Sequence, residues 1–278
     1  MKKSKIIGLV VALGLLVTLA ACGSGSSSAD KDSKKDNVLK VGASNVPHAE
    51  ILEYVKPILE KEGIDLQITT YQDYVLPNKA LADGEIDANY FQHIPYFNLQ
   101  VKDNKYDFAN AGAIHIEPLG LYSKRVKKLA DVKDGGTVLV SNSTTDWGRV
   151  ISILQDAGLV KVKDGVDITT ATFDDIVENK KNLKFTYEAE PALMTTFLNN
   201  DEADIIAINS NFAVDNGLDP LKDAIALEKT SSPYTNIIAV RSEDKNNENI
   251  KKLVEVLKSK DVKEWILDKW KGAVIPVD

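Results

Sequence analysis

Hydrophobic and polar positions along most of the chain follow two periods, one typical of strands and one typical of helices. Residues 38–42 alternate as in a strand, and the apolar residues of 51–59 then fall on one helical face. Gly63 is expected to end this helix, because glycine favours the backbone conformation that closes one. Residues 64–71 alternate again, which predicts a second strand.

The same succession continues to the carboxyl terminus. We predict further strands near 86–90, 137–140, 183–187 and 203–208, and further helices over 77–82, over 145–157 and after Pro191. We expect residues 249–278 to be helical, with one apolar face over 250–257 and an amphipathic partner around Trp265. Strands that alternate with helices of about 10–15 residues indicate parallel sheets with crossover helices. The predicted fold class is therefore α/β, and the body of the chain could form two lobes of about 120 residues each.

The amino terminus has a different pattern. Three lysines in the first five residues precede residues 6–20, which carry no charge. This run is shorter than the roughly 20 residues of a membrane-spanning helix and is typical of a signal-peptide core. It ends in Leu19-Ala20-Ala21-Cys22-Gly23, small residues before a cysteine, as in the bacterial lipobox. We predict that 1–21 is a signal peptide and that Cys22 becomes the lipidated first residue.

Residues 23–37 contain a single apolar residue, Ala29, among Ser, Gly, Asp, Lys and Asn. Such a segment cannot bury enough surface to offset the entropy of ordering it. We therefore predict that 22–37 is a lipidated flexible tether, which holds the folded body at the extracytoplasmic face of the cell membrane.

Composition and charge narrow the classes of function. The formal net charge is −7, from 34 basic and 41 acidic residues, which argues against nucleic-acid binding. Cys22 is the one cysteine, so an intramolecular disulfide and a cysteine-based metal site are excluded. Nucleophile elbows, phosphate loops and paired zinc motifs are absent from the sequence. We expect no enzymatic activity, no cofactor and no metal site, with a zinc-scavenging lipoprotein as the alternative that the three histidines leave open.

Aromatic residues are concentrated in one stretch. Six of the 19 aromatics lie within 71–97, interleaved with Asn78, Asn89, Gln92 and His93. Aromatic walls with a few polar groups are typical of small-molecule pockets, and buried phenols need hydrogen-bond partners. We expect a pocket here, with core positions for Tyr71, Tyr90 and Phe97.

Arginine is rare in the chain, with three among the 34 basic residues. Arg149 closes the segment Val140-Ser-Asn-Ser-Thr-Thr-Asp-Trp-Gly-Arg149, where a predicted strand ends and a predicted helix starts. A guanidinium binds a carboxylate through two parallel bonds, and a helix N-terminus supplies further donors. The residues alone leave two interpretations, an anion-binding site or a surface arginine on the first turn.

Several ordered motifs together resemble one family. After the lipobox come Leu39-Lys-Val-Gly42, Tyr74-Val-Leu-Pro-Asn78, Asp87-Ala-Asn-Tyr-Phe-Gln-His93, Pro95-Tyr96, Gly148-Arg149, Ala207-Ile-Asn209, Ser232-Pro-Tyr-Thr-Asn236 and Lys271-Gly-Ala-Val-Ile-Pro276. This order resembles the NlpA-type methionine-binding lipoproteins, the substrate-binding components of methionine ABC importers. The resemblance runs the length of the body.

The resemblance implies a fold and partners. The expected architecture is a two-lobed, periplasmic-binding-protein-like clamp whose ligand lies in the cleft, with crossing segments near 114–121 and 232–238. One lobe would comprise 38–117 plus 237–278, and the other 118–236. The implied ligand is L-methionine, the implied partners are an ABC permease and its ATPase, and we expect a monomer.

The resemblance also implies site residues. Tyr74, Phe91 and Tyr96 would form aromatic walls around the ligand side chain, with His93 beside them. Arg149 would hold the ligand carboxylate. The amides of Asn209 and Asn236 would contact the backbone end of the ligand.

Two segments depart from the family pattern. The chain has Asn142-Ser-Thr-Thr-Asp146 where relatives commonly have Asn-Asp-Pro-Thr-Asn, so a carboxylate stands three residues before Arg149. Asp146 would either hold the ligand ammonium or pair with Arg149 and weaken the anion site. Glu188-Ala-Glu-Pro-Ala-Leu-Met194 also departs from the usual pattern. A methionine-containing dipeptide or another small apolar amino acid is therefore the alternative ligand.

Overall fold

The computed structural model describes residues 37–229 and 233–278. The predicted signal peptide, the predicted lipidation site Cys22 and the predicted tether up to residue 36 lie outside the described residues. Among the helices that are described, none has both the length and the apolar character needed to cross a membrane.

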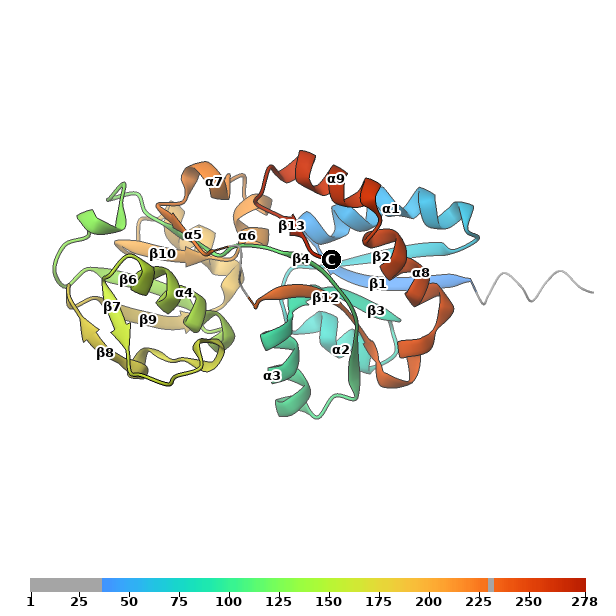
Figure 1. The fold of residues 1–278 in the computed structure, drawn as a ribbon, viewed down its shortest axis with the longest axis horizontal. Helices are drawn as coiled ribbons and strands as arrows, with labels where there is room; N and C mark the ends of the chain where they lie inside the picture. Colours follow the sequence, from blue (N-terminus) through green and yellow to red (C-terminus); the bar gives the residue numbers. More distant parts are fainter. Residues whose placement is uncertain (1–36, 230–232) are drawn as a thin grey trace, which may run out of the picture. The chain divides into compact units, whose positions relative to one another are not determined.

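Sheet 1 is mixed, with parallel pairing on one side and antiparallel pairing on the other (Figure 1). Strand β1 pairs in parallel with β2 and β3, whereas β12 runs antiparallel to both β3 and β4. Across the sheet the order is β13 (Ile275–Pro276), β4 (Phe108–Ile116), β12 (Thr235–Arg241), β3 (Ala88–His93), β1 (Val38–Ser44) and β2 (Asp65–Tyr71).

Helices pack on both faces of sheet 1. One face meets α1 (Glu50–Lys61), α8 (Glu248–Leu257) and α9 (Lys260–Trp270), and the other meets α2 (Leu76–Ala82) and α3 (Ile94–Asn104). Helix α1 forms where its apolar periodicity predicts, because Ile51, Leu52, Val55 and Leu59 are all buried. It ends before Gly63, whose φ of 83° suits glycine.

Sheet 2 is also mixed and lies beside sheet 1 (Figure 1). Its order is β11 (Ala226–Leu227), β5 (Gly120–Tyr122), β10 (Ile205–Ile208), β6 (Thr137–Ser141) and β9 (Lys184–Ala189). Strand β6 is parallel to β9 and β10, and β5 is antiparallel to β10 and β11. A separate ribbon pairs β7 (Val160–Val162) with β8 (Ile176–Asn179).

Sheet 2 separates two apolar clusters. The first joins α4 (Thr144–Asp156) to one face of the sheet, and the second joins α5 (Met194–Asn199) and α6 (Ser210–Asp215) to the other. Helix α7 (Pro220–Asp223) precedes β11. Beyond its packing on sheet 2, α6 contacts the segment Asn45–Ala49 that follows β1, so it reaches across to sheet 1.

The chain passes between the sheets at two places. Strand β4 of sheet 1 ends at Ile116 and β5 of sheet 2 begins at Gly120, while β11 of sheet 2 ends at Leu227 and β12 of sheet 1 begins at Thr235. These positions fall in or next to the crossing segments expected at 114–121 and 232–238. Because β4 and β12 pair with each other, both crossings leave sheet 1 from adjacent strands.

The structure confirms the α/β class and corrects two predictions about its elements. The sheets are not purely parallel, since β4, β5, β11, β12 and β13 add antiparallel pairs. The predicted helical region 249–278, with its amphipathic partner around Trp265, forms α8 and α9 but ends at Trp270 rather than continuing to residue 278. Lys271 and Gly272 both have positive φ, at 51° and 106°, and this left-handed turn leads into β13.

Candidate functional site

A narrow pocket lies where residues from the two sheets face each other. Each site residue expected from the resemblance, other than the lipidation site, lines this pocket: Tyr74, Phe91, His93, Tyr96, Asp146, Arg149, Asn209 and Asn236. The pocket is also lined by Gln92, Glu117, Ser143, Ser210 and Asn211. The structure therefore brings together residues that are up to 162 positions apart in the sequence, from Tyr74 to Asn236.

We call the side formed by Tyr74, Phe91, His93 and Tyr96 the aromatic wall. The rings of Tyr74 and Tyr96 have centroids 5.9 Å apart, and Tyr74 and Phe91 are also 5.9 Å apart, at tilted or edge-on angles. Tyr96 donates its hydroxyl hydrogen to the Tyr74 carbonyl at 2.9 Å. Tyr74 donates to Asn211 Oδ1 at 2.7 Å, which links this wall to α6.

The phenols of this wall are neutral across the physiological range. Burial raises the pKa of Tyr74 well above its usual value, and the negative charge of Asp146 raises it further. Burial likewise raises the pKa of Tyr96, and the charge of Asp146 adds to this. The aromatic wall therefore offers ring faces, ring edges and hydroxyl groups, but no phenolate charge.

We call the group of Glu117, Asp146, Arg149 and Glu228 the charged wall. The first three line the pocket, and Glu228 supports them as the ion-pair partner of Arg149 without lining the pocket itself. Arg149 donates through Nε and Nη2 to Glu228 Oε2, at 2.9 and 2.6 Å, and through Nη1 to Asp146 Oδ1 at 3.1 Å. Its Nη2 also donates to the Glu117 carbonyl at 2.6 Å. Arg149 is only 4% exposed, so these buried partners replace the water that the guanidinium loses.

The arginine and its acidic partners hold each other in their charged states. Burial alone would lower the pKa of Arg149, but the charges of Glu228 and Asp146 outweigh it and raise that pKa above its usual value. Burial alone would raise the pKa of Asp146. The hydrogen bond from His93 and the charges of His93 and Arg149 outweigh that effect and hold the pKa well below its usual range.

Asp146 thus makes the pairing with Arg149 that was one of its two expected roles. Its Oδ1 also lies 3.2 Å from His93 Nε2, and its Oδ2 accepts a hydrogen bond from Asn209 Nδ2 at 3.0 Å. The interpretation of Arg149 as a surface arginine is wrong, because its side chain is buried in the pocket.

Gly148 fixes how the helix that carries this pair is seated. A Cβ at Gly148 would lie 1.7 Å from the backbone oxygen of Ile168, in the short helix η3 (Ile168–Thr170) that packs on α4. Only glycine fits this approach. Gly148 therefore allows α4 to pack closely on η3, and the adjacent Arg149 supplies the positive charge of the pocket.

Three of the polar residues interleaved with the aromatics form one hydrogen-bonded network. Asn78, Asn89 and Gln92 are buried and bond one another, with Asn89 Nδ2 donating to Asn78 Oδ1 at 2.9 Å and Gln92 Nε2 to Asn89 Oδ1 at 2.8 Å. This network ties α2 to β3 behind the aromatic wall. Of these three, Gln92 alone lines the pocket, whereas Asn78 and Asn89 support it from behind.

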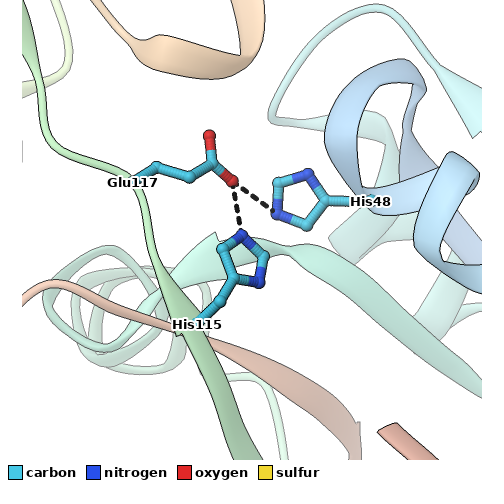
Figure 2. Close-up of side chains that lie close together, drawn as sticks. All are labelled: His48, His115 and Glu117. Atoms are coloured by element: carbon cyan, nitrogen blue, oxygen red, sulfur yellow. Dashed lines mark hydrogen bonds and ion pairs between the residues drawn. The ribbon is translucent and has the colours of Figure 1, made fainter. Parts of the chain in front are cut away.

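Two of the histidines meet behind the pocket, as Figure 2 shows. Glu117 Oε1 lies 3.2 Å from His48 Nε2 and 2.7 Å from His115 Nε2. On their other sides, His48 Nδ1 is 2.6 Å from the Ser44 hydroxyl and His115 Nδ1 contacts the Tyr90 hydroxyl. Burial lowers the pKa of His48 to about 4 and that of His115 to about 3, so both imidazoles are neutral at neutral pH.

Two imidazoles and a carboxylate are also a combination that zinc sites use. Their nearest nitrogen and oxygen atoms all lie within 4.8 Å of one another. Each of these atoms already has a protein partner at hydrogen-bond distance, so the group is complete as a hydrogen-bonded cluster. His93, the third histidine, belongs to the aromatic wall instead.

Sequence reasoning missed the acidic members of the charged wall other than Asp146. Glu117 lies in the expected crossing segment, directly after His115 and Ile116, and a carboxylate in an otherwise apolar crossing was the available signal. Glu228 follows β11, and its sequence neighbourhood contains no comparable signal. Tyr234, whose ring lies 4.9 Å from the Arg149 guanidinium carbon, belongs to the motif that ends at Asn236.

Comparison with known proteins gives a consistent result. The family model for the NlpA lipoprotein matches residues 39–278. The methionine-binding lipoprotein MetQ of Bacillus subtilis is 46% identical over 261 residues, which cover 93% of each chain. A solved structure from Enterococcus faecalis, described as a pheromone cOB1 precursor/lipoprotein of the YaeC family, is 68% identical with a TM-score of 0.85 and covers 86% of this chain and 100% of its own. A Burkholderia cenocepacia nutrient binding protein, solved bound to methionine, is 40% identical with a TM-score of 0.81 and the same coverage.

Proposed function

This chain belongs to the NlpA lipoprotein family, and on that premise we propose that it is an extracytoplasmic binding protein that captures L-methionine and delivers it to an ABC importer. The observation that carries the proposal is the pocket itself, where an aromatic wall faces a charged wall. A thioether gains from contacts with aromatic ring edges. A zwitterion needs both hydrogen-bond donors and acceptors, which the charged wall and the neighbouring amides supply. The role is that of a carrier, with no reaction catalysed.

The ligand would act as a bridge between the two halves of the protein. We assign 38–117 plus 237–278 to one lobe and 118–236 to the other, joined by the two crossings. Tyr74, Phe91 and Tyr96 come from the first lobe, while Asp146, Arg149 and Asn209 come from the second. A ligand that contacts both sets favours the closed arrangement, since binding stabilises whichever state has more contacts with it.

The geometry favours a single amino acid over a methionine-containing dipeptide. Beyond Glu117 and Asn236 the pocket abuts His48 and His115, which are 1% and 0% exposed. A second residue at the backbone end would add about 3.5 Å of chain, and a ligand whose backbone end lies against Glu117 and Asn236 would bring that residue against these buried side chains. Other small apolar amino acids remain the competing ligands, because the aromatic wall accepts any apolar side chain of similar length.

Titration of the full-length chain in detergent tests this function. L-methionine should raise the midpoint temperature of thermal unfolding. At a concentration one hundred times its Kd, the free energy of unfolding should increase by about 2.7 kcal/mol. Glycyl-methionine, leucine and valine should stabilise the protein less at the same concentration. No shift with methionine, or a larger shift with the dipeptide, would contradict the proposal.

The same titration with zinc tests the alternative function, that of a metal-scavenging lipoprotein. Zinc added to chelator-treated protein should leave the unfolding midpoint unchanged. A zinc-dependent rise that is lost in His115→Gln would favour zinc capture at the His48–His115–Glu117 cluster instead.

We also infer that the protein is anchored through lipid on Cys22 and works as a monomer beside a permease and its ATPase. The support is the lipobox sequence and the membership of a lipoprotein family. Several acyl chains hold a protein firmly at a membrane, at about 0.8 kcal/mol per buried methylene. Cys22→Ser should therefore release a ligand-competent protein from the membrane fraction of the producing cells. Retention of the variant in that fraction at the wild-type level would count against lipidation.

A further inference from the structure

The charged wall holds more negative than positive charge. Glu117, Asp146 and Glu228 surround one guanidinium, that of Arg149, and all four side chains are buried. The two imidazoles beside Glu117 do not redress the balance, since burial lowers the pKa of His48 and of His115 and leaves both neutral at neutral pH. A surplus of buried negative charge is costly unless a cation enters. The site thus favours a ligand that brings a positive group.

Two of the three carboxylates already face a cation. Asp146 Oδ1 accepts from Arg149 and its Oδ2 accepts from Asn209. Glu228 Oε2 accepts two bonds from Arg149 and a third from the backbone N–H of Leu119. Both carboxylates therefore have a cationic partner within the protein, although they share the single charge of Arg149.

Glu117 differs from both. It offers Arg149 its backbone carbonyl rather than its carboxylate. Among the described residues, the ion-pair partners of its carboxylate are His48 and His115 alone. Burial raises the pKa of Glu117, and this effect outweighs the opposing influence of His48, Arg149, His93 and the backbone N–H of Asn211, which donates to the carboxylate. Glu117 is the carboxylate with a charge left to satisfy.

The surroundings of Glu117 also set its direction. Its Oε1 is fixed by the two Nε2 atoms, and Figure 2 shows the other carboxylate oxygen turned away from both imidazoles. Each imidazole can donate from Nε2 when its Nδ1 accepts a hydrogen bond, and hydroxyl groups of Ser44 and Tyr90 stand at those nitrogens. The histidines lie behind the carboxylate, while Glu117 itself lines the pocket.

We propose that Glu117 binds the ammonium group of the ligand, that His48 and His115 position its carboxylate, and that this ammonium contact outweighs the carboxylate contact in ligand recognition. The proposal rests on the proposed capture of an amino acid, and it adds which group of that amino acid contributes most to binding. It replaces Asp146 as the ammonium acceptor.

The occupation of Arg149 supports the second half of this proposal. A guanidinium has five N–H groups. Nε donates to Glu228, Nη2 donates to Glu228 and to the Glu117 carbonyl, and Nη1 donates to Asp146. One N–H on Nη1 is left for a ligand carboxylate, which allows a single bond rather than a two-bond fork. Arg149 therefore offers a ligand carboxylate fewer hydrogen bonds than the resemblance implies.

Three probes separate the two ends of an amino acid. L-methionine carries both groups, 3-(methylthio)propylamine carries the ammonium alone, and 4-(methylthio)butanoate carries the carboxylate alone. Calorimetric titration of the full-length chain in detergent should give a Kd for the amine at least 10-fold below that of the acid. Equal affinities, or tighter binding of the acid, would overturn the proposal.

Glu117→Gln keeps the shape of the side chain and removes its charge. Charge-assisted hydrogen bonds of the usual strength correspond to about 10-fold to 150-fold in affinity, so methionine should bind this variant weaker by a factor in that range. The amine's advantage over the acid should also disappear. If Glu117→Gln fails to fold, Glu117→Asp serves instead, because it withdraws the carboxylate by one methylene and should reduce the same advantage.

Asp146→Asn is the matched control, since it makes the same charge change on the same wall. It should keep the advantage of the amine over the acid, because the proposal places the ammonium on Glu117 and not on Asp146. Loss of that advantage in Asp146→Asn with retention in Glu117→Gln would assign the ammonium to Asp146.

The positioning histidines need a readout other than stability. Glutamine places an N–H near the position of Nε2, so His115→Gln should keep the amine's advantage, whereas His115→Leu should reduce it. Equal advantages in the two variants would remove His115 from the positioning role.

Failure of this proposal is distinct from failure of the proposed function. Methionine binding with equal affinity for amine and acid would contradict the ammonium assignment and leave methionine capture standing. Binding of the amine without binding of methionine would contradict methionine capture and leave the assignment standing.

Discussion

The aromatic wall and the charged wall enclose the same pocket but are built in opposite ways. Tyr74, Phe91, His93 and Tyr96 come from one stretch of 23 residues and meet through ring contacts and neutral hydrogen bonds. The charged wall combines a pair from one helix, Asp146 and Arg149, with Glu117 and Glu228 from segments that are far apart in the sequence, and Arg149 and its carboxylate partners depend on one another for charge. A wall of rings tolerates local change, whereas a wall of mutually dependent charges should fail as a unit.

Removal of the guanidinium of Arg149 should give the largest difference in stability between the two walls. Arg149→Met leaves the buried carboxylates of Asp146 and Glu228 without their shared guanidinium, and removing one partner of a buried ionic group costs about 3–5 kcal/mol of folding free energy. Urea unfolding measures this loss. Phe91→Leu is the counterpart in the aromatic wall and should cost less than about 1.5 kcal/mol. Equal losses in the two variants would contradict the difference between the walls.

The close packing of α4 at Gly148 should give the next largest effect on stability. Gly148→Ala places a Cβ 1.7 Å from the Ile168 backbone oxygen, and overpacking of this kind costs about 1–3 kcal/mol. Because the helix must shift to relieve the contact, affinity for methionine should fall as well. Ser152→Ala, on the same helix but half-buried, should change stability by less than about 0.5 kcal/mol. An unchanged urea midpoint for Gly148→Ala would refute this account of the glycine.

The two histidines behind the charged wall, His48 and His115, should make the stability of the protein sensitive to acid. The folded pKa of His48 is about 4 and that of His115 about 3, against 6.5 when unfolded, so the unfolded chain binds more protons between pH 6.5 and 4. Stability is therefore fully present above pH 6.5 and is lost as the pH falls, by up to about 1.4 kcal/mol per pH unit for each histidine.

His115→Gln should flatten this slope by the share of one histidine, which chemical denaturation at pH 7.5, 6.5 and 5.5 would measure. Glu117 acts in the opposite direction, since burial raises its pKa, and it is present in both proteins. Tyr96→Phe should leave the slope unaltered, because no group of the aromatic wall that it changes titrates in this range. A wild-type slope in His115→Gln would contradict the buried neutral histidine.

The smallest effect is expected within the aromatic wall. Tyr96→Phe removes the hydrogen bond to the Tyr74 carbonyl and should cost about 0.5–1.5 kcal/mol of stability. The ring contacts remain, so methionine should bind with nearly wild-type affinity in calorimetry. A loss of affinity as large as that of Glu117→Gln would show that the hydroxyl contacts the ligand.

These two walls also differ in how far the sequence could predict them. The aromatic stretch stands out in the sequence, and α1, α4 and the strands of residues 38–44 and 205–208 follow from periodicity. Strand β4 does not, because Phe108 to Ala113 are all half-buried and show no alternation. The resemblance indicated Arg149, and the sequence placed one carboxylate partner, Asp146, three residues before it. The other partner, Glu228, is 79 residues away in the sequence and depends on the tertiary arrangement. Local pattern encodes the rings, and only the folded chain shows which charges meet.

Trp147 gives the charged wall an optical reporter. It lies between Asp146 and Gly148, its indole N–H donates to the Ser141 carbonyl at 2.9 Å, and its ring centroid is 4.5 Å from that of Tyr187. The other two tryptophans of the chain, Trp265 and Trp270, are on α9. With both of those replaced by phenylalanine, the fluorescence of the protein would come from a single indole beside the arginine. Its emission maximum and quenching would then follow any movement of α4, with no label attached.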